Sequence, residues 1–248
     1  MKKSITIAVA LFAALWLPAA EPTVTSAATE EVERVWSVTA ATEFDTRFLF
    51  RGADVLNHPV SMSSVTATWK DLTGYVCQYF GQYSNGTYSE TDIGVEYKKS
   101  LDQLTITGGV VGYISNLHEV TEDTAELYVS LACDCYLRPA LTLNWDVVAV
   151  NGGYLSLSIS HEYDVSKPLS LPESQSLTIV PFALTGFDLE YNSAANSMND
   201  VLLGMNASWA RGRLTISAGY SLSLALEALN SIEQGRVQVG RCALSWEF

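Results

Sequence analysis

The chain has 248 residues and a formal net charge of −13, and hydrophobic residues make up 48% of it against 17% charged residues. A charged fraction this low is unusual for a soluble domain, where about 25% is typical. The acidic balance argues against nucleic acid as a partner, because its phosphates require clustered Lys and Arg.

The N-terminus has the three parts of a secretory signal peptide. Two lysines are followed by an apolar run over residues 5–17 and then by small residues. This run is shorter than the roughly 20 residues that a membrane-spanning helix needs. We therefore predict a signal peptide over residues 1–28, cleaved after Ala20 or Ala28, with an anchor that is never removed as the alternative. The remainder, residues 29–248, is expected to form one all-β domain.

A first strand is predicted over residues 36–51, because apolar and polar side chains alternate there with a period of two. One face carries Val38, Ala40, Thr42, Phe44, Thr46, Phe48 and Phe50. The opposite face carries Glu43, Asp45, Arg47 and Arg51. The charged face suits an enclosed, watery interior, and the apolar face suits lipid.

The same alternation recurs along the chain. Further strands are predicted at 60–70, 74–84, 90–98, 104–114, 124–132, 138–148, 153–163, 176–190, 200–210, 213–223 and 236–248. Most have about 9–11 residues, the length that crosses a bilayer when tilted. An even count is typical of a bacterial barrel with both termini in the periplasm. We predict a closed, antiparallel, up-and-down transmembrane β-barrel of about twelve strands, with a soluble β-sandwich as the alternative.

The alternation is least regular over residues 176–190, where a proline interrupts it. Pro181 has no N–H group to donate to a closed ladder. We expect a β-bulge at this residue to absorb the defect.

Eight charged residues fall at the alternate strand positions whose side chains are predicted to face the lumen. These candidate pore-lining residues are Glu43, Asp45, Arg47, Arg51, Asp92, Glu96, Glu126 and Asp146. Such charges either line a watery path or pair with one another in a plug that closes the interior. Because carboxylates are in excess, an open path is expected to prefer cations.

Aromatic residues gather at strand ends, as in the girdles at the two membrane interfaces of a barrel. The predicted interface residues are Trp36, Trp69, Tyr75, Tyr97, Trp209 and Trp246, with Phe50, Tyr83, Tyr113 and Tyr220 near the opposite ends. The last strand ends in Leu-Ser-Trp-Glu-Phe. This ending resembles the closing-strand signal of the bacterial barrel-assembly machinery, with Phe248 as its terminal residue.

Catalytic and metal-binding patterns are weak in this chain. The four cysteines, Cys77, Cys133, Cys135 and Cys242, lack the spacing of a zinc site. Ser160-His161-Glu162 places His161 on the opposite strand face from its two neighbours. We therefore expect no enzymatic activity and no cofactor.

Residues 48–52 read Phe-Leu-Phe-Arg-Gly and are followed by a loop, Pro59-Val60 and an alternating strand. In this arrangement the sequence resembles the TorF family of porins, whose first strand usually ends in an aromatic-x-x-Arg-Gly element. The similarity is best over residues 36–115. The resemblance implies an outer-membrane barrel and a pore, without specifying a substrate.

Together these patterns predict an exported porin-like channel in the outer membrane, for passive diffusion of small solutes or ions. Its expected partners are outer-membrane lipid, the barrel-assembly machinery and the permeating solutes. Two alternatives remain: a closed structural or adhesive barrel, and an outer-membrane lipid-modifying enzyme.

Overall fold

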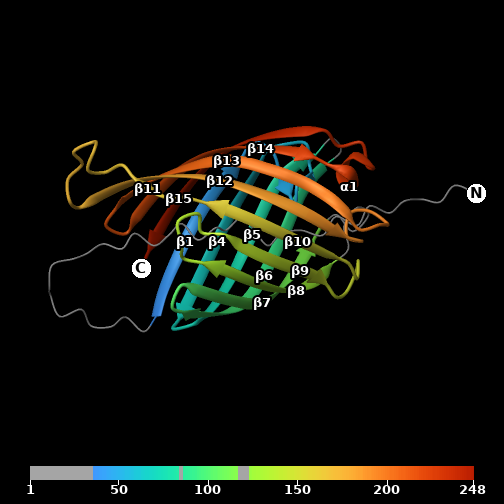
Figure 1. The fold of residues 1–248 in the computed structure, drawn as a ribbon, viewed down its shortest axis with the longest axis horizontal. Coiled ribbons are helices and arrows are strands. Elements are labelled where there is room, and N and C mark those ends of the chain that lie inside the picture. The colour runs from blue at the N-terminus through green and yellow to red at the C-terminus, as the bar shows by residue number, and fades with distance from the viewer. Residues whose placement is uncertain (1–35, 84–85, 117–122) are drawn as a thin grey trace, which may run out of the picture.

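A computed structural model describes residues 36–83, 86–116 and 123–248, and within these ranges twelve strands form an antiparallel barrel (Figure 1). The barrel strands are β1 (Trp36–Asp45), β4 (Val60–Trp69), β5 (Leu72–Tyr83), β6 (Gly86–Leu101), β7 (Leu104–Ser115), β8 (Thr124–Cys133), β9 (Ala140–Asp146), β10 (Gly153–Ser160), β12 (Gln175–Leu189), β13 (Ser197–Arg211), β14 (Leu214–Ala225) and β15 (Arg236–Glu247). Smaller elements are β2 (Leu49–Phe50), β3 (Ala53–Asp54), β11 (Tyr163–Asp164) and helix α1 (Glu227–Asn230). The predicted signal peptide, residues 1–28, lies outside the described residues.

The barrel closes because its first strand pairs with both its chain neighbour and the last strand. In the register of β1, Asp45 lies opposite Val60 of β4 and opposite Arg241 of β15. On the far side of the barrel, β10 pairs with β12. The predicted closed barrel of twelve strands is confirmed. Among the described residues, no helix has the length and apolar character needed to cross a membrane.

The two ends of the barrel differ. Trp36 begins β1 at the rim where the C-terminus also lies, and the Phe248 amide donates a hydrogen bond to the Val38 carbonyl at 2.9 Å. We call this rim the terminal end, and the opposite rim, where Asp45 ends β1, the loop end. The hairpin from β11 to β12 extends past the terminal end (Figure 1).

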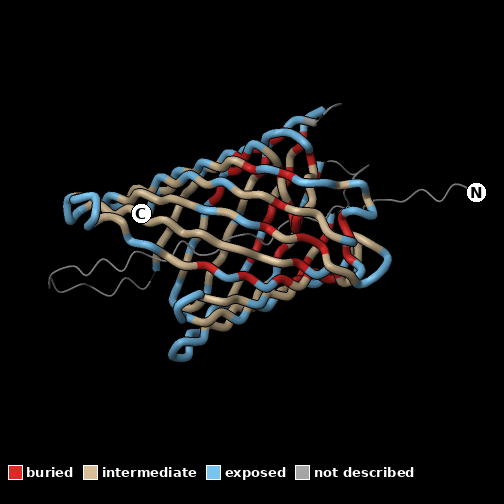
Figure 2. The backbone as a smooth tube through the Cα atoms, turned by 45° about the horizontal axis from the view of Figure 1, so that its top comes forward, coloured by how far each residue is buried: buried red, intermediate tan, exposed pale blue. Residues whose placement is uncertain are grey.

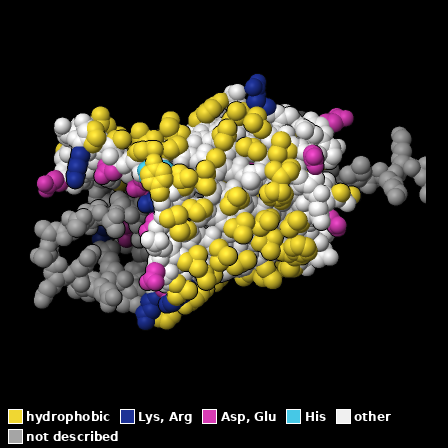
Figure 3. Space-filling model, in the orientation of Figure 1, with side chains coloured by type: hydrophobic (Ala, Val, Ile, Leu, Met, Phe, Trp, Pro, Cys, Tyr) yellow, Lys and Arg dark blue, Asp and Glu magenta, His cyan; other side chains and the backbone are white. Residues whose placement is uncertain are grey.

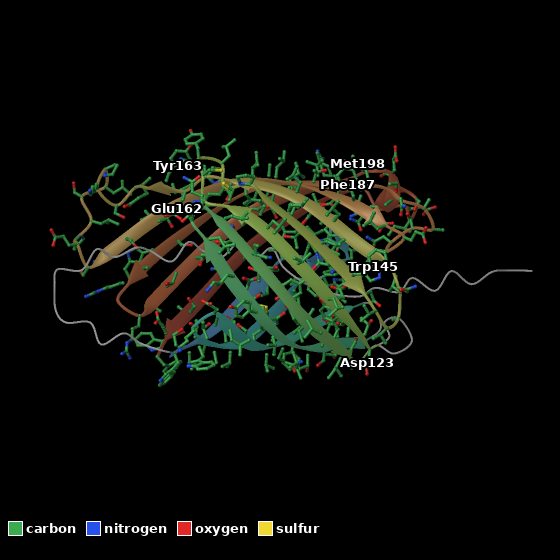
Figure 4. The ribbon with its side chains drawn as sticks, turned by 60° about the horizontal axis from the view of Figure 1, so that its bottom comes forward. Asp123, Trp145, Glu162, Tyr163, Phe187 and Met198 are labelled. Carbon is green, nitrogen blue, oxygen red and sulfur yellow. The ribbon has the colours of Figure 1, made fainter. Side chains whose placement is uncertain are left out.

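The outer wall is apolar and the inner wall is mostly polar, because alternate residues of a strand point to opposite faces. On β5 and β6, Val76, Phe80 and Ile93 are exposed on the outside, while Asp92 is buried inside. Hydrophobic side chains spread over the barrel wall in Figure 3, and acidic side chains on that face gather toward its two ends. Figure 4 places Trp145 toward the loop end and Tyr163 toward the terminal end.

The predicted first strand is too long, and its apolar face is wrong beyond residue 45. The chain leaves the sheet after Asp45, and residues 46–59 turn inward as a loop that carries the β2–β3 hairpin. Phe48 and Phe50 are 1% and 3% exposed and belong to the buried core, so they do not face lipid. Alternation continues through this segment, but its apolar residues meet aromatic rings of the inner wall.

The β-bulge expected at Pro181 lies elsewhere. Pro181 pairs in register with Met205 of β13, and the β12–β13 register shifts between Gly186 and Phe187 instead. The Pro181 carbonyl accepts a hydrogen bond from the His161 amide at 3.2 Å, just beyond the end of β10. In an antiparallel strand the N–H and C=O of one residue point to the same neighbour. The missing N–H therefore falls at the break between β10 and β11, where the ladder is already interrupted.

Buried residues concentrate in the half of the barrel toward the loop end (Figure 2). The buried core includes residues of loop 46–59 and of the inner wall: Phe48, Phe50, Leu56, Val60, Met62, Tyr79, Tyr88, Val111, Tyr113 and Tyr191. The lumen is thus filled at the loop end by a loop and aromatic side chains.

Candidate functional site

The tip of the β2–β3 hairpin places a charged side chain inside the barrel. Arg51 donates a hydrogen bond from Nη2 to the Oε2 carboxylate atom of Glu126 on β8, and both side chains are almost completely buried. Removing two charges from water is costly unless they are paired and hydrogen-bonded. The pair therefore ties loop 46–59 to a residue of the opposite wall.

Aromatic side chains surround this ion pair. The Tyr113 hydroxyl donates to Glu126 Oε2 and the Tyr191 hydroxyl to Glu126 Oε1, each at 3.1 Å. The Arg51 guanidinium lies over the rings of Tyr191 and Phe50, 4.4 and 4.6 Å from their centroids. Cation–π contacts of this kind strengthen when the cation is desolvated.

The electrostatic surroundings keep Arg51 charged. Burial by itself would lower the pKa of Arg51, but the Glu126 carboxylate raises it above its usual value. Burial raises the pKa of Tyr191 well above its usual range, against the opposing effect of Arg51. The phenol stays protonated and keeps donating to Glu126.

A second set of contacts holds the same hairpin tip through its backbone. Asn199 Nδ2 donates to the Arg51 carbonyl at 2.6 Å, and Ser223 Oγ donates to the Gly52 carbonyl at 3.3 Å. The Gln234 amide group also donates to the Gly52 carbonyl. Gly52 has φ +78°, and a Cβ there would lie 2.5 Å from Cγ of Asp200. Only glycine fits this conformation without strain.

The predicted lumen residues Glu43 and Asp45 share one arginine. Arg241 of β15 binds Asp45 through two hydrogen bonds, Nε to Oδ1 at 2.9 Å and Nη2 to Oδ2 at 2.8 Å. Its Nε also lies 3.1 Å from Oε1 of Glu43. These ion pairs join the first strand to the last and so reinforce the closure of the barrel.

The other predicted lumen residues occupy different settings. Arg47 pairs with Asp54 at 2.8 Å within loop 46–59, so it is not part of the barrel wall. Glu96 accepts a hydrogen bond from the Tyr128 hydroxyl at 2.6 Å. Asp146 caps the turn that follows β9, because its Oδ1 accepts hydrogen bonds from the amides of residues 148, 149 and 150.

Asp92 lies beside a second acidic residue on the same face of β6. Glu90 and Asp92 are 1% and 2% exposed, and because they are two residues apart on β6 their carboxyl groups point into the same part of the lumen. Neither forms an ion pair with a described Lys, Arg or His side chain. Oε1 of Glu90, Oδ1 of Asp92 and the Tyr88 hydroxyl have no hydrogen-bond partner among the described residues.

The half of the lumen toward the terminal end is lined by small hydroxyl side chains. Thr68 and Thr73 lie 3.2 Å apart on β4 and β5, and Ser130 and Thr142 lie 2.8 Å apart on β8 and β9. Side chains this small leave more of the cross-section free than the aromatic residues at the loop end.

The structure distributes the predicted interface aromatics unequally. Trp36, Trp69, Tyr97 and Trp246 are exposed on the outer wall, and Trp209, also on the outer wall, donates from Nε1 to Gln175 at 3.0 Å. The placement of Tyr75 at the interface is wrong. Its ring lies over Gly94 on the inner wall, where a Cβ at Gly94 would come within 2.1 Å of it.

Two aromatics predicted for the opposite interface also point inward. Tyr113 is 2% exposed and bonds Glu126, and Phe50 lies under Arg51. Aromatic residues of a strand fit either face of a barrel wall, so their position along the strand does not decide the face.

The histidines and cysteines form no recognisable catalytic group in the described part of the chain. His58 is exposed, and His161 Nδ1 lies 2.5 Å from the Tyr136 carbonyl oxygen. His118 lies outside the described residues. All four cysteines are free thiols.

Several residues of the site went unrecognised in the sequence. Arg241 and Glu90 occupy strand positions whose side chains alternate into the lumen, so the pattern of alternation already predicted that they face inward. Tyr191 and Asn199 lie at the ends of strands next to a polar connection, and no sequence pattern marks them as partners of Arg51.

The fold has solved structural counterparts. The KdgM porin superimposes with a TM-score of 0.55 and 10% identity, over 86% of this chain and 99% of that one. LpxR from Salmonella typhimurium gives 0.54 and 8% identity, over 84% and 99% of the two chains. The NanC porin gives 0.51 and 10% identity, over 85% and 98%.

The chain has the fold of an outer-membrane β-barrel. At these identities the likeness concerns the fold alone, and two of the three counterparts are described as porins. No protein-family model matches the sequence, and no curated protein matches it.

Proposed function

We propose that this protein is an outer-membrane channel for passive diffusion of small solutes, with loop 46–59 as its constriction. The observation that carries the proposal is that an inward loop, packed against side chains of the wall, fills the loop end of a twelve-strand lumen. Barrels of eight strands are filled by side chains, whereas those of 16–18 strands leave a channel. Twelve strands enclose an intermediate lumen that an inward loop can narrow.

The charge of the lumen supports a preference for cations. Its acidic residues include Glu43, Asp45, Glu90, Asp92, Glu96, Glu126, Asp146 and Asp200, against the basic residues Arg51 and Arg241. An excess of carboxylates lowers the cost of entry for positive charge and raises it for anions.

The same proposal assigns the chain its place in the cell. The terminal end would face the periplasm, the outer wall would contact outer-membrane lipid, and the barrel-assembly machinery would recognise the strand that ends at Phe248. Membership of the TorF family is part of this proposal and rests on residues 48–52. We assign no enzymatic activity, since neither described histidine lies among the lumen carboxylates.

Single-channel recording in planar bilayers tests the proposal. Residues 47–58 are replaced by a short Gly-Ser linker, which suffices because Asp45 and Val60 already pair directly. We expect a small conductance from the natural protein and a larger one from the variant, because the linker clears the loop end. In both, a salt gradient should give a reversal potential of the sign expected for cation preference.

A matched control shortens the β11–β12 hairpin by removing residues 167–172, which extend beyond the terminal end and should leave the conductance unchanged. Absence of current from both the natural protein and the linker variant would reject a channel. Equal conductance of the two would reject loop 46–59 as the constriction, and anion preference would reject the selectivity.

One observation favours a closed structural barrel as the second candidate. Phe48 packs its ring 5.4 Å from that of Tyr79 and 5.5 Å from that of Tyr88, and Leu56 is also buried. A loop packed this well can seal the lumen permanently. In that case the natural protein carries no current, whereas the linker variant does.

A further inference from the structure

We propose that Tyr88, Glu90 and Asp92 form a binding site for a hard divalent cation of the Ca²⁺ class. The three residues alternate along β6, so their side chains point to the same face, into the lumen. All three are buried, with exposures of 0%, 1% and 2%. The site adjoins the Arg51–Glu126 pair, because Asp92 lies opposite Tyr113, which bonds Glu126, but it does not depend on whether the barrel conducts.

The first argument concerns charge. Two carboxyl groups on the same face of β6 lie in a water-poor part of the barrel without a described cationic partner. Two adjacent carboxylates cannot both remain charged there unless something compensates them. A divalent cation matches both charges with one ion.

The second argument is the unpartnered tyrosine. The Tyr88 hydroxyl lies near the Glu90 carboxyl, but the two groups do not form a hydrogen bond of normal geometry, and the hydroxyl has no access to solvent. Most buried hydroxyl groups have a partner, and an exception calls for an unseen water or ion. Together with the free Oε1 of Glu90 and Oδ1 of Asp92, this hydroxyl supplies a third oxygen.

The donor set selects the type of ion. Oxygen ligands alone suit hard cations, whereas zinc and the softer metals prefer nitrogen and sulfur. Mg²⁺ demands near-ideal octahedral geometry, which three side chains of one strand do not provide, while Ca²⁺ accepts irregular coordination and bidentate carboxylates. The described residues hold no group of three or more His, Cys, Asp and Glu side chains suited to a metal, so the proposed set of ligands depends on Tyr88 as its third member.

Loop 46–59 covers the site from the loop end. The Phe48 ring lies 5.5 Å from the Tyr88 ring and 5.4 Å from the ring of Tyr79, the cross-strand neighbour of Glu90. An ion bound during folding would therefore be enclosed when the loop packs into the lumen. For this reason the test supplies the cation while the barrel refolds.

Terbium luminescence provides the measurement. The mature chain is refolded in detergent with Tb³⁺, tyrosine is excited, and terbium emission is recorded while Ca²⁺ is added. We expect emission that Ca²⁺ displaces. In Glu90→Gln and in Asp92→Asn, half-saturation should require at least about tenfold more Tb³⁺, because a charged ligand is lost.

Glu96→Gln is the matched control, since Glu96 lies on the same face of β6 but already accepts a hydrogen bond from Tyr128. It should bind Tb³⁺ as the natural protein does, and heat-dependent gel mobility verifies that each variant folds. If emission is absent from the natural protein, or unchanged in both carboxyl variants, a shared proton neutralises the pair and the proposal falls. Because no current is measured, this failure is distinct from failure of the channel.

Discussion

At the scale of single residues, the hairpin tip combines a charge and a conformation that depend on each other. Arg51 and Gly52 both have positive φ, +46° and +78°, and this tight turn directs the Arg51 side chain to Glu126. Gly52 then presents its carbonyl to Ser223 and Gln234 while the side chain of Asp200 packs against its Cα. A side chain at this position would push the tip away from the wall and separate the ion pair.

Gly52→Ala should therefore destabilise the closed loop by about 2–5 kcal/mol. This figure adds the cost of a left-handed conformation at alanine to the cost of an overpacked contact with Asp200. Gly212→Ala is the matched control. Gly212 also has a positive φ, +57°, but nothing lies within 4 Å of its Cβ position, so only about 1–2 kcal/mol is expected. The free energy of unfolding in detergent, measured for both variants, checks the difference. Equal losses would show that Asp200 does not crowd this site.

At the scale of elements, the break between β10 and β11 explains how a proline fits in the middle of a long strand. β10 pairs with β12 as far as Ser160, and pairing resumes at Tyr163. Pro181 occupies the gap, where no neighbouring carbonyl requires its missing N–H. The proline is placed where the sheet is already open.

Pro181→Ala should consequently change the free energy of unfolding by less than about 0.5 kcal/mol. Ala183→Pro provides the contrast. Ala183 pairs with Ile159 of β10, and because it lies two residues from Pro181 its N–H points toward β10. Losing that hydrogen bond and leaving the facing carbonyl of β10 unpaired should cost about 1–3 kcal/mol. Comparable effects of the two substitutions would contradict the assigned break.

At the scale of the whole molecule, the barrel separates two environments. The wall presents apolar residues outward and hydroxyl or charged residues inward, and the loop end is filled by residues 46–59. The described tryptophans, Trp36, Trp69, Trp145, Trp209 and Trp246, all lie on the outer wall. This distribution is expected if lipid, and not a second sheet, contacts the outer face.

Quenching by brominated lipids tests this arrangement. In vesicles of brominated phospholipid, most of the tryptophan emission of the folded barrel should disappear, because every described tryptophan side chain is on the outer wall. Iodide in water should quench much less. Emission that resists brominated lipid would indicate tryptophans packed within protein, as in a soluble β-sandwich.

The amino-acid sequence by itself determined the barrel. A period of two imposes opposite faces on every strand, and lipid and lumen select different side chains for those faces. Eleven of the twelve strands were placed within a few residues of their observed bounds, from β4 to β15. The same rule predicted which charged side chains point into the lumen: those of Glu43, Asp45, Asp92, Glu96 and Glu126.

Only the tertiary structure decided where residues 46–59 go. Lipid and an aromatic plug are both apolar, so alternation cannot distinguish an outward Phe48 or Phe50 from a buried one. The partners also lie far apart along the chain, 75 residues for Arg51 and Glu126 and 196 for Asp45 and Arg241. Contacts across a lumen depend on closure of the sheet, which no local pattern encodes.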